Sequence, residues 1–73
     1  MALVIKVSNA QSGGKGHYKR VAVFNIEVGD DVPTRIVRQD QRLVKLWDHV
    51  SYGGPKSQYG RALSEAVAMG ALL

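Results

Sequence analysis

The chain has no cysteine among its 73 residues, so neither a disulfide bond nor a thiolate metal site stabilises it. A chain of this length forms a single domain, residues 1–73, and buries only about 60% of the surface of its unfolded state. Stability must therefore come from packing, from a metal held by other ligands, or from a partner. A hydrophobic content of 45% suits a folded core rather than a disordered tail.

Long apolar runs are also missing. The segment Ala2-Leu3-Val4-Ile5 is interrupted by Lys6, so the N-terminus does not resemble a signal peptide. No segment approaches the roughly 20 apolar residues that span a bilayer. These absences predict a cytoplasmic protein without membrane association.

Acidic residues are absent from the first 26 positions, which contain Lys6, Lys15, Lys19 and Arg20. From Glu27 onward six basic residues balance six acidic ones, so the whole net charge of +4 belongs to the N-terminal third. This asymmetry favours an anionic partner there, either nucleic acid or an acidic protein surface. Charge that merely keeps the protein soluble is the alternative explanation.

Alternating apolar residues predict the first two strands. Leu3, Ile5 and Val7 form one face of a short strand near the N-terminus, and Tyr18–Val28 alternates over a longer stretch. The composition of residues 29–31, Gly-Asp-Asp, is typical of a turn. Thr34–Arg38 is then predicted as a third strand that returns antiparallel to the second.

The next segment has a helical spacing. The apolar residues Leu43, Leu46, Trp47 and Val50 predict a helix that begins near Asp40 and ends before residues 53–55, Gly-Gly-Pro. A second helix is predicted from about Ser57, with Arg61 and Glu65 on its outer side and an inner face of Tyr59, Leu63, Ala66, Val67 and Gly70. The fold class is α+β, a three-stranded antiparallel meander followed by two helices in one small domain.

One alternative for the middle of the chain stays open. Arg35, Arg38, Arg42, Lys45 and His49 recur at spacings of three and four, as they would along a single long helix from residue 33. The β-branched pair at positions 36 and 37 favours a strand there. Residues 33–50 are thus either a strand plus a helix or one long helix.

The glycine-rich stretch SGGKGHYKR, residues 12–20, links the first two strands through a loop at 9–17. It has neither the spacing of a Walker phosphate loop nor a third glycine for a dinucleotide fingerprint, and it leads into a strand rather than a helix. The loop exceeds the two to five residues of ordinary hairpin connections, and long loops often bind partners. Lys15, Lys19 and Arg20 suit phosphates or acidic side chains, while His17 and Tyr18 suit stacking on a base.

No constellation of catalytic residues is visible. His17 and His49 lack the spacing of metal ligands, and the serines lack a partnering base or a Gly-x-Ser-x-Gly turn. We therefore expect a protein that is not an enzyme and needs no cofactor.

The outer strands of a meander have free edges, which extended peptides of other proteins can join. Leu3–Val7 and Thr34–Arg38 are the predicted edges. The predicted partner-binding residues are Leu3, Ile5, Lys15, His17, Tyr18, Lys19, Arg20, Arg35 and Arg38.

Taken whole, the stretches SGGKGHYKRVAVFNIEV and RLVKLWDHVSYGGPKSQYGRALSEAVAMGALL resemble the small transcription regulators that lytic bacteriophages of Xanthomonas make against the host RNA polymerase. The resemblance implies binding to the large subunits of bacterial RNA polymerase, displacement of the sigma factor, and antitermination in the cytoplasm of the host. It also implies a host elongation factor as a further partner. It transfers no individual residue, because it contains no motif. RNA or DNA contact stays open, and a small basic nucleic-acid-binding module is the alternative function.

Overall fold

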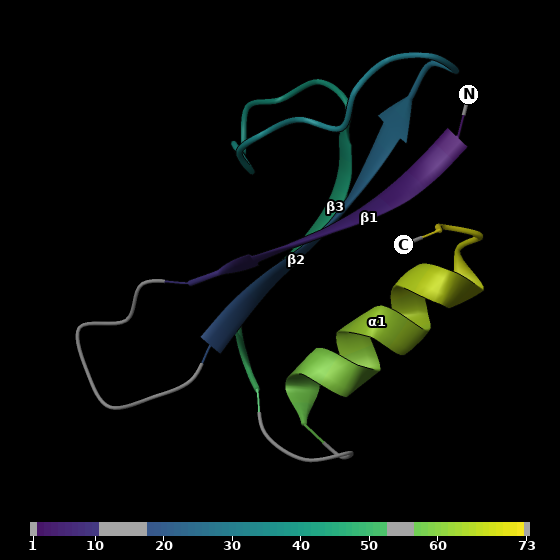
Figure 1. Cartoon of the computed structure of the whole chain (residues 1–73). Coiled ribbons are helices and arrows are strands. Elements are labelled where there is room, and N and C mark those ends of the chain that lie inside the picture. Colours follow the sequence, from purple (N-terminus) through teal and green to yellow (C-terminus); the bar gives the residue numbers. More distant parts are fainter. Residues whose placement is uncertain (1, 11–17, 53–56, 73) are drawn as a thin grey trace.

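A computed structural model describes residues 2–10, 18–52 and 57–72 (Figure 1). Its elements are β1 (Ala2–Asn9), β2 (Tyr18–Ile26), β3 (Leu43–Ser51) and α1 (Gln58–Ala68). The strands form one antiparallel sheet in the order β1-β2-β3. The predicted α+β domain with a three-stranded antiparallel meander is confirmed, but the third strand is not the predicted one, and the described residues contain one helix where two were predicted.

The central strand β2 is buried on both faces. Val21, Ala22, Val23 and Phe24 have no exposed surface. Because successive side chains of a strand point to opposite faces, Val21 and Val23 contribute to one core while Ala22 and Phe24 contribute to another. The sheet therefore lies in the middle of the domain, between two hydrophobic cores.

The two cores have different covers. On the helix face of the sheet, α1 packs Ala62 and Ala66 against the strands, and Ala71 joins them. On the opposite face, which we call the connection face, the segment between β2 and β3 places Ile36 over Phe24 and its neighbours. Figure 1 shows this connection (teal) and α1 (green to yellow) on opposite sides of the sheet.

The region 43–51 is a strand, so the predicted helix from Asp40 and the alternative long helix from residue 33 are both wrong. The apolar spacing misleads because β3 packs on both faces and carries two irregularities. Its pairing with β2 shifts register once near Val44 and again near Asp48 and His49, where β3 has an extra residue. Leu43 and Leu46 consequently reach the connection-face core, while Trp47 and Val50 reach the helix-face core. Two bulges thus reproduce the i, i+3, i+4, i+7 spacing of a helix.

Residues 27–42 form an irregular connection, so the prediction of a strand at Thr34–Arg38 is wrong. Gly29, with φ of 95°, makes the turn after β2, closed by a hydrogen bond from the Asp30 N–H to the Glu27 carbonyl. Near its other end the Asp40 carboxylate accepts from the backbone N–H of Arg42, a turn contact rather than the predicted helix cap.

The helix α1 begins and ends with regular caps. Ser57 is its N-cap, as predicted, and accepts a hydrogen bond from the Gly60 N–H. At the other end Gly70 adopts φ of 90°, and the Ala71 N–H donates to the Ala66 carbonyl, the pattern of a Schellman motif. The predicted inner face is right for Ala66 but wrong for Val67, which is 63% exposed.

The chain after α1 returns to the sheet and lies along β1. Leu72 donates its N–H to the Leu3 carbonyl and accepts at its own carbonyl from the Ile5 N–H, at 3.0 and 2.7 Å. This single parallel bridge occupies part of the outer edge of β1. On the other side of the sheet, β3 pairs with no second strand among the described residues.

Candidate partner-binding surface

Aromatic and basic side chains gather at one end of the sheet. β2 begins there, β3 ends there and α1 begins there (Figure 1). We call this region the aromatic end and define it by five residues: Tyr18, Lys19, His49, Tyr52 and Tyr59. All three tyrosines of the chain belong to it.

On the helix face of this end, Lys19 is held between two groups. Its Nζ lies 2.8 Å from Asn9 Oδ1 and 4.9 Å from the centre of the Tyr52 ring. Tyr52 meets the Tyr59 ring edge-on, with centroids 4.8 Å apart. Tyr59 in turn packs on the helix-face core, so the set is anchored at its base while Tyr52 remains 50% exposed. An ammonium over an aromatic face and an edge-to-face ring pair are both favourable geometries.

On the connection face of the same end, Tyr18 lies beside His49, with ring centroids 5.8 Å apart. His49 does not lie near the end of a helix, because the region predicted as a helix is the strand β3. It occupies a bulge of β3 with φ of 51°, a conformation that histidine adopts more readily than most side chains. The Asp48 carboxylate accepts the His49 backbone N–H at 2.9 Å and supports this turn of the backbone. The bulge places the imidazole, which is exposed, next to Tyr18.

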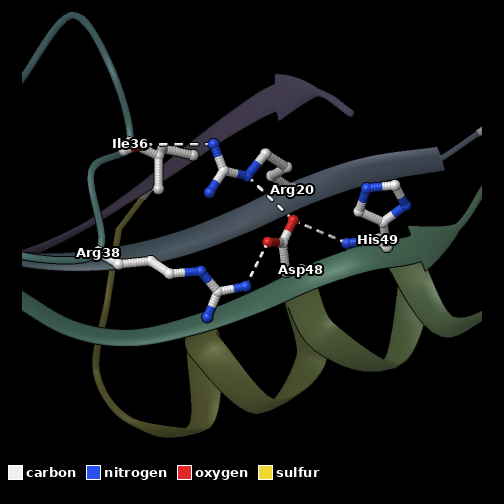
Figure 2. A network of polar contacts seen from close by, with 5 residues as sticks. All are labelled: Arg20, Ile36, Arg38, Asp48 and His49. Atoms are coloured by element: carbon white, nitrogen blue, oxygen red, sulfur yellow. Dashed lines mark hydrogen bonds and ion pairs between the residues drawn. The ribbon is translucent and has the colours of Figure 1, made fainter. Parts of the chain in front are cut away.

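Arg20 serves the fold rather than the aromatic end. Figure 2 shows its guanidinium between the Asp48 carboxylate, 3.0 Å from Nε, and the Ile36 carbonyl, 3.2 Å from Nη1. Arg38 reaches the other oxygen of Asp48 at 2.6 Å. The carboxylate thereby joins β2, β3 and the 27–42 connection on one face. We call Arg20, Asp48 and Arg38, with the Ile36 carbonyl, the arginine network.

The electrostatics of Asp48 are set by this network. Partial burial alone would raise the pKa of its carboxyl group, but the charge of Arg20, the hydrogen bonds from both arginines and the His49 N–H outweigh burial. The pKa of Asp48 therefore lies below its ordinary value. Asp48 is a structural anion, and it neutralises cations that the sequence assigned to a partner.

The predicted partner-binding residues thus divide among several places. Lys15 and His17 lie outside the described residues. Tyr18 and Lys19 belong to the aromatic end but project on opposite faces of β2, and Arg20 pairs with Asp48.

The remaining predicted residues lie elsewhere. Leu3 and Ile5 lie on β1, where Leu72 already uses two of their outward backbone groups. Arg35 is exposed on the connection, whereas Arg38 belongs to the arginine network. The predicted partner-binding residues that the structure describes therefore do not form one surface.

Tyr52 and Tyr59 are the binding candidates that the sequence reasoning did not select. Tyr59 was assigned to the inner face of a helix, and Tyr52 precedes a glycine-rich turn. The two tyrosines lie on either side of that turn, which brings a strand end and a helix start together. Their spacing was the signal available for predicting that they meet. Only the position of β3 in the sheet places Tyr52 beside Lys19, with Tyr59 against Tyr52.

Within the described ranges no three histidine, aspartate or glutamate side chains are grouped to hold a metal ion. In that same part of the chain, no helix is long and apolar enough to cross a membrane. No family model, curated protein or solved structure matches this chain.

Proposed function

We propose that this chain is a non-enzymatic regulator that binds bacterial RNA polymerase, displaces the sigma factor at host promoters and acts in antitermination. The resemblance to the regulators of Xanthomonas bacteriophages supplies the identity of the partner. The aromatic end is the observation that supports a binding role: it exposes tyrosine rings and holds a lysine over one of them, Tyr52. Tyrosine is enriched at the energetic centres of protein interfaces, and rings held in place lose little rotamer freedom on binding.

The test is sigma release from purified bacterial RNA polymerase holoenzyme that carries a fluorescent sigma factor. Added wild-type chain is expected to release sigma in a concentration-dependent manner. The double variant Lys19→Ala/Tyr52→Ala should need about tenfold more protein, the loss typical of removing a central interface contact. Val28, which is 86% exposed and lies outside the aromatic end, supplies the control variant Val28→Ala. Retention of sigma at saturating wild-type chain would overturn the proposal.

The aromatic end also favours a second function, a small basic module that binds single-stranded nucleic acid. Exposed rings beside a lysine are what such modules use, because bases stack on the rings while cations contact phosphates. Salt separates the two functions. Each phosphate contact adds about 0.7 to the slope of log affinity against log salt for single strands, whereas a protein interface built on tyrosines is less sensitive.

A further inference from the structure

A cleft of about 360 Å³ lies between β3 and α1, next to the aromatic end. Its strand side is formed by the consecutive residues 47–50, and its helix side by Gln58, Arg61, Ala62 and Glu65. Four consecutive strand residues have side chains on both faces of the sheet. The cleft therefore opens along the outer edge of β3 and not only over the helix face.

Among the described residues, no strand pairs with the backbone of β3 along this edge. The backbone groups of Leu3 and Ile5 in β1 point outward and bond to Leu72, so the alternate residues of β1 pair inward with β2. The same alternation continues through the antiparallel sheet. The residues of β2 that point away from β1 pair with Lys45 and Trp47, so the backbones of these two residues point toward β2. The N–H and carbonyl of Leu46 therefore point outward, between two residues whose pairing with β2 is regular.

The charges around the cleft favour an acidic occupant. Asp48 is neutralised by Arg20 and Arg38, and Glu65 accepts a 2.8 Å hydrogen bond from the Trp47 indole. The Arg61 guanidinium, by contrast, makes no ion pair with any residue that the structure describes.

Lys45 adds a second positive charge near the cleft. Its Nζ lies 5.0 Å from the centre of the Trp47 ring, and Lys45 is exposed. The floor of the cleft is apolar, because Val50 and Ala62 are buried there.

We infer that the outer edge of β3 and the cleft beside α1 form a groove for an extended acidic peptide segment of another protein. The peptide pairs its backbone with Leu46 and its neighbours, directs small apolar side chains to Val50 and Ala62, and places a carboxylate against Arg61. Nucleic acid fits this groove less well, because it cannot continue the backbone ladder. A second copy of the chain fits less well too, because the two bulges bend the edge of β3 away from simple self-pairing.

The groove adjoins the aromatic end and shares His49 with it, but the inference does not require RNA polymerase to be the partner. Its test uses random nine-residue peptides, the length of β3, displayed for selection on the immobilised full chain. The selected peptides should alternate apolar and acidic residues. Titrated into isotopically labelled chain, the best of them should shift the amides of residues 44–48 and 58–65 and protect the Leu46 amide from hydrogen exchange.

Two charge reversals provide the matched comparison. Arg61→Glu should weaken the selected peptide about tenfold or more, because like charges then oppose each other at the groove. Arg35→Glu makes the same change in net charge on an exposed arginine of the connection, and it should leave the affinity nearly unchanged. An amide spectrum of each variant checks that it is folded.

Three results would overturn the inference: no enrichment of acidic peptides, amide shifts confined to other surfaces, or equal losses for the two arginine variants. An oligothymidine that displaces the peptide and shifts the same amides would also overturn it, in favour of nucleic acid. Because this assay contains no polymerase and the sigma-release assay contains no peptide, either proposal can fail without the other.

Discussion

The two faces of the sheet are covered by different kinds of segment, a helix on one face and an irregular connection on the other. On the helix face, α1 satisfies its own backbone hydrogen bonds and needs only to bury Ala62 and Ala66. On the connection face, residues 27–42 have no regular backbone pairing and bury one side chain deeply, Ile36. Side chains supply what the backbone lacks there, because Arg20 binds the Ile36 carbonyl and Asp48 binds Arg38.

This contrast indicates that cations in a short basic protein do not all serve partners. Lys19 and Arg20 are neighbours in the sequence, yet Lys19 faces the helix side and Arg20 faces the connection side. Arg20 closes the fold, while Lys19 remains on the candidate binding surface. The adjacent cations Lys19 and Arg20 therefore have different roles, one on the candidate binding surface and one in the fold.

The largest effect is expected at the connection-face core. Phe24 has no exposed surface and is the largest fully buried side chain of the described residues, so Phe24→Ala should cost about 3–5 kcal/mol of unfolding free energy. A domain this small has little stability in reserve, so the variant should be largely unfolded at room temperature. Far-ultraviolet circular dichroism during urea titration measures this. A variant that unfolds at the wild-type urea midpoint would show that this face is not a core.

The next effect tests whether the connection is a real cover. Ile36 is 7% exposed and comes from a segment without regular structure, and Ile36→Ala should cost about 2–5 kcal/mol if that segment is docked. The matched control is Val37→Ala, because Val37 is its neighbour and is 45% exposed. Urea midpoints for the two variants make the comparison. Equal, small losses would mean that residues 27–42 do not close this face.

A smaller loss is expected from the arginine network. Asp48→Asn leaves the Arg20 guanidinium, with 25% of its side chain exposed, without a charged partner, and should cost about 1–3 kcal/mol. The double variant with Arg20→Gln should lose less than the sum of the single losses, because the two side chains share one interaction. Strict additivity would show that they do not interact.

The same network predicts a pH dependence. The pKa of Asp48 is lower in the folded chain than its ordinary value of 3.8, so its contribution to stability is complete above that value. It is lost as the pH falls below 3.8 and through the folded pKa. Asp40 acts in the same direction, because hydrogen bonds from the Arg42 side chain and backbone lower its pKa. Urea midpoints at descending pH should show the difference between wild type and Asp48→Asn shrinking in this window, whereas a constant difference would contradict the account.

The smallest effect is expected at Arg38. Its side chain is 68% exposed although it binds Asp48, and exposed ion pairs contribute about 0–1 kcal/mol. Arg38→Ala should therefore shift the urea midpoint only slightly, and less in high salt. A loss as large as that of Asp48→Asn would place Arg38 at the centre of the network instead of Arg20.

The sequence predicted β1, β2 and α1 correctly, because each has a simple period and recognisable ends. It failed at β3 for a physical reason. Apolar residues of β3 pack on both faces of the sheet, and two bulges give them the spacing of a helix. The same error prevented prediction of the candidate site, because only β3 brings Tyr52 beside Lys19 and Asp48 beside Arg20. A lone arginine within the apolar side of β2 was the available sign that an acidic partner lay across the sheet.

The most direct test of the binding account is a hydrogen-exchange footprint of the chain bound to purified bacterial RNA polymerase. The proposed binding role predicts slower amide exchange at residues 18–19, 49–52 and 58–60, which contain the five residues of the aromatic end. It predicts little change on the outer side of α1, around the exposed Val67. Protection of that outer side alone, with the aromatic end exchanging as in the free chain, would contradict it.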